Sequence, residues 1–194
     1  RDRRCIMYLG EAPRYAVEML KGGSRPTGGD MGLSRRLFLI GGIGAFLTAC
    51  SDKFKTYNGP DVTKIQVFKG ARTMQLLHQN VQLKSYKFEL GFAPAGHKIQ
   101  RGDGKTPIGL YKIDRRNPES AYHLSIGISY PDVEDRARAA ALGVNPGGDI
   151  FIHGTPREKL GQRDWTWGCI AVKNHEMEDI YAMVKNGTPI AIFD

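Results

Sequence analysis

The stretch FIHGTPREKLGQRDWTWGCIAVKN, residues 151–174, places a histidine and a cysteine each beside a glycine. The two residues before His153 are apolar and typical of a buried strand, which stops at Gly154. Cys169 follows Gly168 and precedes an apolar run. Because glycine lets the backbone turn tightly and approach a neighbour closely, the cysteine is expected where a turn enters a strand. Two reactive side chains are thus predicted at the ends of short buried segments.

Short alternating apolar patterns on both sides of this stretch predict a mainly β fold. Strands are expected at 62–68, 74–77, 81–90, 110–113, 123–129, 149–153 and 190–193. The first three suggest a meander. Two short helices are expected at 131–143 and 174–187. The second has Asn174 as a candidate N-cap and an apolar stripe typical of core packing, formed by Met177, Ile180, Tyr181 and Val184.

The composition is that of a globular protein with one core, with 41% hydrophobic and 25% charged residues in a chain of 194. The net charge of +8 is unevenly distributed. Residues 1–50 hold 8 Lys/Arg and 4 Asp/Glu, which leaves 20 basic and 16 acidic side chains for the rest. No basic stripe is interleaved with stacking aromatics, so a nucleic-acid partner is not predicted.

Residues 31–50, MGLSRRLFLIGGIGAFLTAC, have the pattern of an export signal. A positive start at Arg35 and Arg36 precedes an uncharged apolar stretch that ends in small residues. The apolar run 37–50 is 14 residues long. A spanning helix needs about 20, so a signal is favoured over a membrane span. The protein is therefore expected to be exported, to the periplasm or cell envelope.

Two short motifs refine this interpretation. Residues 34–39, SRRLFL, resemble a twin-arginine export motif, and 47–50, LTAC, are similar to a bacterial lipobox. The second resemblance implies that Cys50 is lipidated and anchors the protein to a membrane. A soluble exported protein cleaved nearby is the alternative.

The segments on either side of the signal are predicted to lack a fold of their own. Residues 1–30 begin with Arg1 and include a Gly/Pro-rich stretch, so they are interpreted as a disordered upstream extension, with Met31 as the true start. Residues 51–62 are expected to be a linker, and 63–194 the folded domain.

The cysteine count narrows the role of Cys169. Cys5 lies upstream of the expected start and Cys50 is the expected lipid site, so Cys169 has no partner for a disulfide in an oxidising compartment. It is reactive, metal-bound or buried. Three other histidines, His97, His123 and His175, do not have ligand spacing, so no metal site is predicted.

The ordered motifs resemble those of a known family. His153-Gly154 followed by Thr166-x-Gly168-Cys169-Ile170 is similar to the signature of L,D-transpeptidases, the YkuD-type domain that remodels bacterial peptidoglycan. The upstream Thr106-Pro107-x-Gly109-x-Tyr111 matches the T-P-x-G element of that family. The resemblance covers about residues 63–193. It implies a β-sandwich that carries a catalytic Cys/His edge with a short helix over it.

The resemblance also implies roles for the site residues. Cys169 would be the nucleophile, His153 its general base, and the Gly154 carbonyl would orient the imidazole. Backbone N–H groups near Gly168 could form the oxyanion site, with Thr166 and Trp167 shaping the pocket beside the thiol. Such enzymes bind peptidoglycan stem peptides, need no cofactor, and hold the acyl group as a thioester that a neighbouring amine attacks. A nearby imidazole is expected to lower the pKa of the thiol below about 8.5.

Two departures from the family pattern leave the acceptor open. Trp167 stands where the family usually has His, and Ala171 where it usually has Arg. The second resembles a sub-branch in which some members hydrolyse links between peptidoglycan and attached proteins. The alternatives are therefore transpeptidation, hydrolysis by the same site, and a catalytically inactive peptidoglycan-binding lipoprotein. A basic set could meet stem-peptide carboxylates or form a solvated face: Arg101, Lys105, Arg115 and Arg116.

Overall fold

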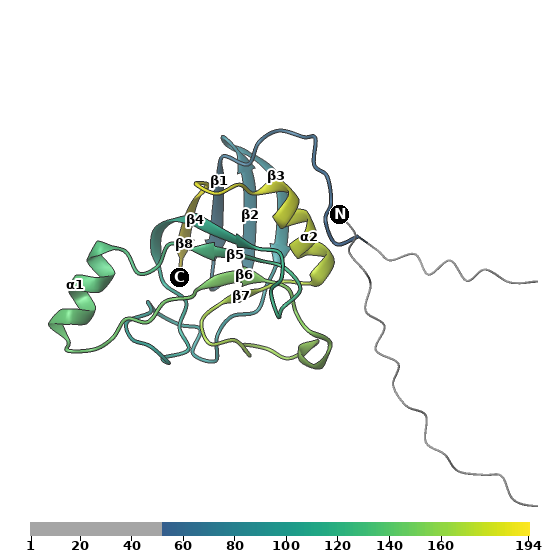
Figure 1. Ribbon diagram of the computed structural model, residues 1–194. Coiled ribbons are helices and arrows are strands. Elements are labelled where there is room, and N and C mark those ends of the chain that lie inside the picture. The colour runs from purple at the N-terminus through teal and green to yellow at the C-terminus, as the bar shows by residue number, and fades with distance from the viewer. Residues whose placement is uncertain (1–51) are drawn as a thin grey trace, which may run out of the picture. The chain divides into compact units, whose positions relative to one another are not determined.

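The computed structural model describes residues 52–194 (Figure 1). Its strands are β1 (Lys64–Phe68), β2 (Thr73–His78), β3 (Val81–Lys87), β4 (Gly109–Asn117), β5 (Ser125–Ile128), β6 (Phe151–His153), β7 (Ile170–Ala171) and β8 (Pro189–Phe193). Its helices are α1 (Val133–Ala141), the 3-10 helix η1 (Arg157–Lys159) and α2 (Asn174–Met183). The predictions for residues 1–50, including the export signal and lipidation of Cys50, lie outside the described residues. Neither α-helix of the described part has the length and apolar character required to cross a bilayer.

The strands form one mixed sheet in the order β3-β2-β1-β8-β4-β5-β6-β7. The first three form the predicted antiparallel meander. The strand β8, the last in the chain, lies between β1, to which it is parallel, and β4, to which it is antiparallel. The mainly β prediction is confirmed, and two of the strand pairs are parallel, β1 with β8 and β6 with β7.

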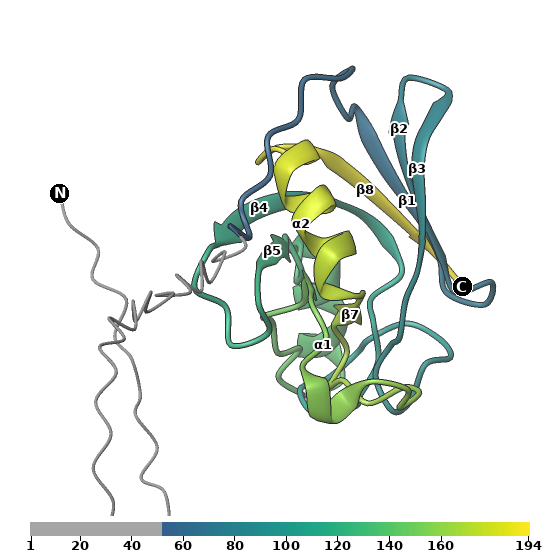
Figure 2. The same cartoon turned by 90° about the vertical axis from the view of Figure 1, so that its right-hand side faces the viewer.

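The sheet curls at β4, because the first part of this strand pairs with β8 and the second part pairs with β5. Residues 109–112 of β4 pair with β8, and residues 113–117 pair with β5 after a register shift at Ile113. Two isolated bridges, Glu89 to Ala171 and Gly91 to Thr166, connect the chain beyond β3 to the far edge of the sheet. Figure 2 shows β1, β2, β3 and β8 as one side of the fold and β4, β5 and β7 as the other. The sandwich is therefore built from a single curled sheet.

The core lies inside this curl and along α2, which packs on β5 and β6. Buried residues alternate with more exposed ones along β1 and β8, as expected for strands with one buried face. All four residues of β5 are buried, in accordance with a central strand. Side chains without solvent exposure from seven elements meet in the core, including Ile65, Met74, Leu76, Ile113, Ile126, Ile152, Ile170 and Ile180.

The helix α2 differs from its prediction at both ends. Its first helical residue is Asn174, which was the predicted N-cap, and its last is Met183, four residues before the expected end at 187. Lys173 is the N-cap, and its backbone N–H donates to Glu176 at 3.0 Å. Asn174 is already inside the helix, and its side-chain carbonyl instead accepts the N–H of Thr155 at 2.9 Å. The prediction of Asn174 as the cap is therefore wrong, because its side-chain oxygen accepts a hydrogen bond from Thr155 instead of capping the helix. This bond ties the start of α2 to the chain after His153.

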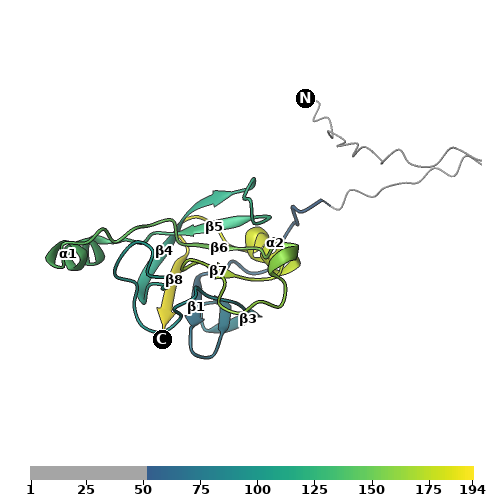
Figure 3. The ribbon, with the colours of Figure 1, turned by 90° about the horizontal axis from the view of Figure 1, so that it is seen from below.

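The helix α1 stands away from the rest of the domain (Figures 1 and 3). Asp132 caps it by accepting the N–H of Asp135 at 2.8 Å. Among its residues only Asp135 and Ala139 are buried. The segments before and after α1 return to the body of the protein, where they border the site described next.

Candidate active site

His153 ends β6, and Cys169 immediately precedes β7, the parallel strand beside it at the edge of the sheet. Ile152 is paired with Ile170, and His153 with Ala171. Both isoleucines are completely buried, so they face the core. Because side chains alternate along a strand, His153 and the residue before Ile170 lie on the opposite face. Strand pairing thus places these two residues on the same face of the sheet edge.

A tight turn places Cys169 at the start of β7. Gly168 has a φ of +118°, and a Cβ atom at this position would lie 2.4 Å from the carbonyl oxygen of Lys105. The hydroxyl of Thr166 accepts the Gly168 N–H at 3.2 Å and donates to the carbonyl of Cys169 at 2.8 Å. Thr106, fully buried, donates to the Gly168 carbonyl at 2.7 Å. Two threonines therefore fix the turn on both sides, and the Gly168 N–H is engaged within it.

The thiol of Cys169 is half-buried and makes two long contacts. The N–H of Phe151 lies 3.4 Å from Sγ, and the carbonyl oxygen of Asp149 lies 3.5 Å from it. Burial raises the pKa of the thiol above its ordinary value of 9.0, and the Phe151 N–H partly opposes this by lowering the pKa. The direction is opposite to the one expected from the sequence, since desolvation has the larger effect in this state.

The imidazole of His153 is held in one orientation. Its Nδ1 lies 2.7 Å from the carbonyl oxygen of Gly154. A carbonyl can only accept, so Nδ1 carries the proton and Nε2 of the neutral ring has a free lone pair. The ring is only 3% exposed, and burial lowers its pKa below 6.5, while the bond to Gly154 raises it. A neutral imidazole with an accepting Nε2 is suited to take a proton from a nearby thiol.

Two aromatic rings enclose this imidazole and were not singled out in the sequence. Tyr122 stacks on His153 with ring centroids 4.6 Å apart, and Trp165 meets it edge-on at 5.6 Å. Tyr122 belongs to the segment before β5 and Trp165 to the turn before Cys169. Neither has a spacing to His153 that a motif could reveal, because the contacts arise only from the tertiary fold.

The Cys169 thiol opens into a cleft of about 760 Å³. The cleft is lined by Lys98, Arg101, Gly102, Arg115, Tyr130, Asn145, Gly147, Gly148, Asp149, Ile150, Trp167 and Cys169. Trp167 is 71% exposed and packs edge-on against Phe92, with centroids 5.1 Å apart. Trp167 therefore contributes a largely exposed aromatic ring to the cleft that contains the thiol.

The basic residues singled out in the sequence divide into two groups. Arg101 and Arg115 line the cleft, whereas Arg116 donates to the carbonyls of Tyr181 and Val184 on α2 and just beyond it. Lys105 is not among the residues that line the cleft.

Arg115 is held against the cleft by its surroundings. Its guanidinium lies 4.6 Å from the centroid of the Phe151 ring and 3.3 Å from the carboxylate of Asp149. It crosses Gly127 on β5, where a Cβ atom would lie 2.4 Å from the Arg115 side chain. One cation is thus oriented at the cleft before any ligand arrives.

No group of three or more His, Cys, Asp or Glu suited to a metal occurs within residues 52–194. Cys169 is a free cysteine. The cleft presents the thiol of Cys169 together with the cationic side chains of Lys98, Arg101 and Arg115.

The pKa directions predict how Cys169 reacts with iodoacetamide. The thiol pKa is raised above 9.0 and the imidazole pKa is lowered below 6.5, so both groups are neutral between these values. Since the thiolate is the reactive species, the alkylation rate should keep rising as the pH passes 9.0. Mass spectrometry of samples quenched at set times would measure the alkylation rate at each pH, in protein carrying Cys5→Ser and Cys50→Ser. A rate that reaches its plateau below pH 7 would instead indicate a thiolate–imidazolium pair.

Known proteins share sequence similarity with most of this chain. The model of the family described as YkuD, L,D-transpeptidase catalytic domain, matches residues 63–192. YafK of Escherichia coli strain K12 is 30% identical over 149 residues, which are 74% of this chain and 55% of YafK.

Solved structures show the same fold. A mutant of the helical cell shape determining protein Pgp2 from Campylobacter jejuni superposes with a TM-score of 0.57 at 25% identity, over 70% of this chain and 48% of Pgp2. Bd1075 of Bdellovibrio bacteriovorus gives a TM-score of 0.53 at 23% identity, over 73% of this chain and 51% of Bd1075. The chain spans about half the length of the relatives that it matches.

Proposed function

The chain belongs to the L,D-transpeptidase catalytic-domain family, and from this premise we propose that it is a cysteine-dependent peptidoglycan L,D-transpeptidase. Its donor is a stem peptide that ends in D-alanine, and its acceptor is an amine of a neighbouring stem. The observation that carries the proposal is the shared face of Cys169, just before β7, and His153, at the end of β6, with the imidazole Nε2 free to accept a proton.

The reaction follows from these groups. The Cys169 proton passes to Nε2 of His153 as Sγ attacks the carbonyl carbon that precedes the terminal D-alanine. The carbon–nitrogen bond then breaks, and the D-alanine amine leaves with the proton from Nε2. The acyl group remains on Sγ as a thioester. An acceptor amine attacks that thioester, gives its proton to His153, and the thiol is restored.

The buried environment determines when the proton moves. The thiol pKa is raised and the imidazole pKa is lowered, so transfer in the free protein is uphill by about 1.4 kcal/mol for each unit that separates them. We infer that transfer accompanies the attack, when sulfur no longer has to carry a full negative charge. In this role the Gly154 carbonyl holds the tautomer and stabilises the imidazolium.

The charge of the cleft supports a peptide substrate with free carboxylates. Arg101 and Arg115 line the cleft that contains Cys169. Arginine binds carboxylates through two parallel hydrogen bonds, which position as well as attract the ligand. A peptidoglycan substrate places the protein in the cell envelope. Anchoring through Cys50 remains a separate prediction.

Hydrolysis is the second candidate, and one observation favours it. Trp167 is 71% exposed and the thiol is only half-buried, so water can reach the thioester. An inactive binding protein is less well supported, because a site that had lost its activity would have no need for a fixed tautomer beside a thiol.

Intact-mass analysis of an acyl-enzyme tests the proposal. Full-length protein is incubated with purified tetrapeptide muropeptides, with and without an added D-amino acid. The masses of the protein and of the products are then measured by mass spectrometry. We expect the mass of a stem peptide without its last D-alanine on Cys169, and exchanged or crosslinked products when an amine is present. Trimmed stems alone would indicate the hydrolase. Absence of both adduct and products would contradict an enzymatic role on stem peptides.

A further inference from the structure

The helix α1 is attached to the domain in an unusual way. A surface helix normally docks through an apolar stripe, whereas α1 buries a carboxylate, Asp135, and one small side chain, Ala139. The Asp135 side chain is only 4% exposed. A carboxylate in this environment is costly unless donors surround it. Its partners therefore show what holds α1 in place.

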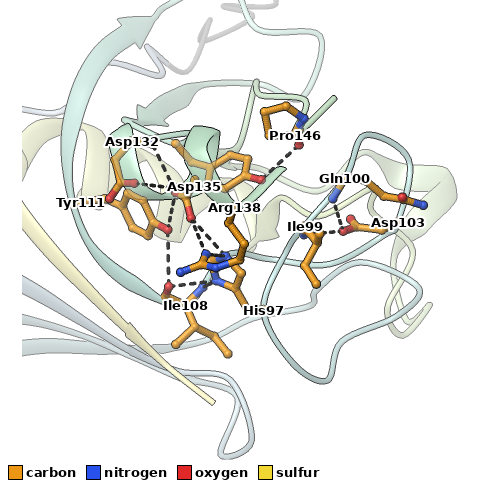
Figure 4. A network of polar contacts seen from close by, with 11 residues as sticks. His97, Ile99, Gln100, Asp103, Ile108, Tyr111, Asp132, Asp135, Arg138 and Pro146 are labelled. Carbon is orange, nitrogen blue, oxygen red and sulfur yellow. Dashed lines mark hydrogen bonds and ion pairs between the residues drawn. The ribbon is translucent and has the colours of Figure 1, made fainter. Parts of the chain in front are cut away.

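Asp135 receives donors from three parts of the chain (Figure 4). One carboxylate oxygen accepts the hydroxyl of Tyr111 at 2.9 Å and the N–H of Asp132 at 3.2 Å. The other lies 3.1 Å from Nε2 of His97 and 3.2 Å from the guanidinium of Arg138. We name His97, Tyr111, Asp135 and Arg138 the Asp135 cluster. The carboxylate joins β4, α1 and the loop that begins at His97.

Two loops line the cleft, one that begins at His97 of this cluster and one that follows α1, and we name them its walls. The first wall, residues 97–103, contributes Lys98, Arg101 and Gly102, and the second wall, residues 144–149, contributes Asn145, Gly147, Gly148 and Asp149. They meet where the N–H of Arg101 donates to the carbonyl of Asn145 at 2.7 Å. Both walls therefore depend on how α1 and His97 are held.

Each wall is also ordered internally. In the first wall Asp103 accepts the N–H groups of Ile99 and Gln100 at 2.8 and 3.0 Å. In the second, Tyr130 donates to the carbonyl of Pro146 at 3.1 Å, and the wall ends at Asp149, whose carbonyl contacts the thiol. Because each wall is stiff, a shift at its base would be transmitted along it to the cleft.

We propose that Asp135 is a positioning residue that sets the spacing of the two cleft walls and thereby the affinity for the peptide substrate. The inference rests on the proposed function, in which this cleft binds the stem peptide. Asp135 does not touch the thiol or the imidazole, and the residue after Asp149 is fixed to β5 by the bond from the Ile128 N–H to the Ile150 carbonyl at 2.8 Å. Loss of Asp135 therefore acts on substrate binding and leaves the reactivity of Cys169 intact.

The test compares Asp135→Asn with Glu134→Gln. Both changes neutralise a carboxylate on the same turn of α1, but Glu134 is exposed and Asp135 is buried in the cluster. With purified tetrapeptide muropeptides, Asp135→Asn should raise KM by about 10-fold or more, the effect of weakening hydrogen bonds to a charge, with kcat within about 3-fold. Glu134→Gln should leave both constants unchanged. The rate of Cys169 alkylation by iodoacetamide should be the same in all three proteins.

Hydrogen exchange supplies a readout that does not need activity. In Asp135→Asn the Arg101 amide should lose protection while the amides of β1, β2 and β8 keep theirs. Tyr111→Phe, which removes one donor, should do the same to a smaller degree, and it serves if Asp135→Asn fails to fold. Unchanged KM, or equal loss of protection throughout the sheet, would overturn the proposal. If wild-type protein did not act on stem peptides, the proposed function would fail, and the Arg101 amide would still decide whether Asp135 holds the walls.

Discussion

Cys169→Ala is expected to lower turnover of stem peptides by at least about 10³-fold, because it removes the only group in the cleft that can form the thioester. The fold should survive the change. The sulfur is half-buried and has only two long contacts, at 3.4 Å to the Phe151 N–H and 3.5 Å to the Asp149 carbonyl. Product analysis with purified muropeptides, together with a thermal melt, measures both effects.

His153→Gln is the companion variant for this prediction. Glutamine can keep a donor near the Gly154 carbonyl but cannot act as a base at neutral pH, so turnover should fall by about 10²-fold or more. If Cys169→Ala retained wild-type products, the proposed nucleophile would be wrong. If only His153→Gln retained them, a different group would have to serve as the base.

Gly168→Ala is expected to be the most damaging substitution in the backbone of the site. Gly168 has a φ of +118°, and the added Cβ would lie 2.4 Å from the Lys105 carbonyl oxygen and 3.3 Å from Cδ1 of Ile150. A strained φ and a backbone clash together should cost about 3 kcal/mol of stability. The turn must also shift, and a displacement of about 1 Å at the thiol can reduce turnover by about 10²-fold. Denaturant unfolding and muropeptide turnover would measure the two effects.

Gly161→Ala is the matched control. Gly161 also has a positive φ, +79°, but a Cβ at this position would meet no atom within 4 Å. It should therefore show only the cost of a left-handed residue, about 1 to 2 kcal/mol, with unchanged turnover. Equal losses of activity in both variants would show that the clash with Lys105 has no special role.

The sequence predicted best what depends on local pattern. Alternating apolar residues located the β1–β2–β3 meander. The order of the motifs around His153 and Cys169 identified the family of the chain. The position of β8 between β1 and β4 could not be predicted in this way, because an alternating pattern shows that a segment is a strand but not which strands it pairs with. The same limit explains why Asn174 was assigned as a cap, since its partner Thr155 is 19 residues away.

The parts of the site that lacked a motif were not found in the sequence. Tyr122 and Trp165 enclose His153 only after β5, β6 and the turn before β7 have come together. The thiol pKa was expected in the wrong direction for a related reason. A neighbouring imidazole is visible in the sequence, whereas the degree of burial is a property of the whole fold.

The place of β8 has a consequence for the order in which the protein assembles. The two halves of the sheet are joined through this strand, which is paired with β1 on one side and β4 on the other. A growing chain that has not yet reached residue 189 can form the β1–β2–β3 meander but lacks the strand that docks it to β4. Pairings between such distant segments form slowly. Catalytic competence should therefore appear in one step, only after β8 has been synthesised and has paired with both β1 and β4.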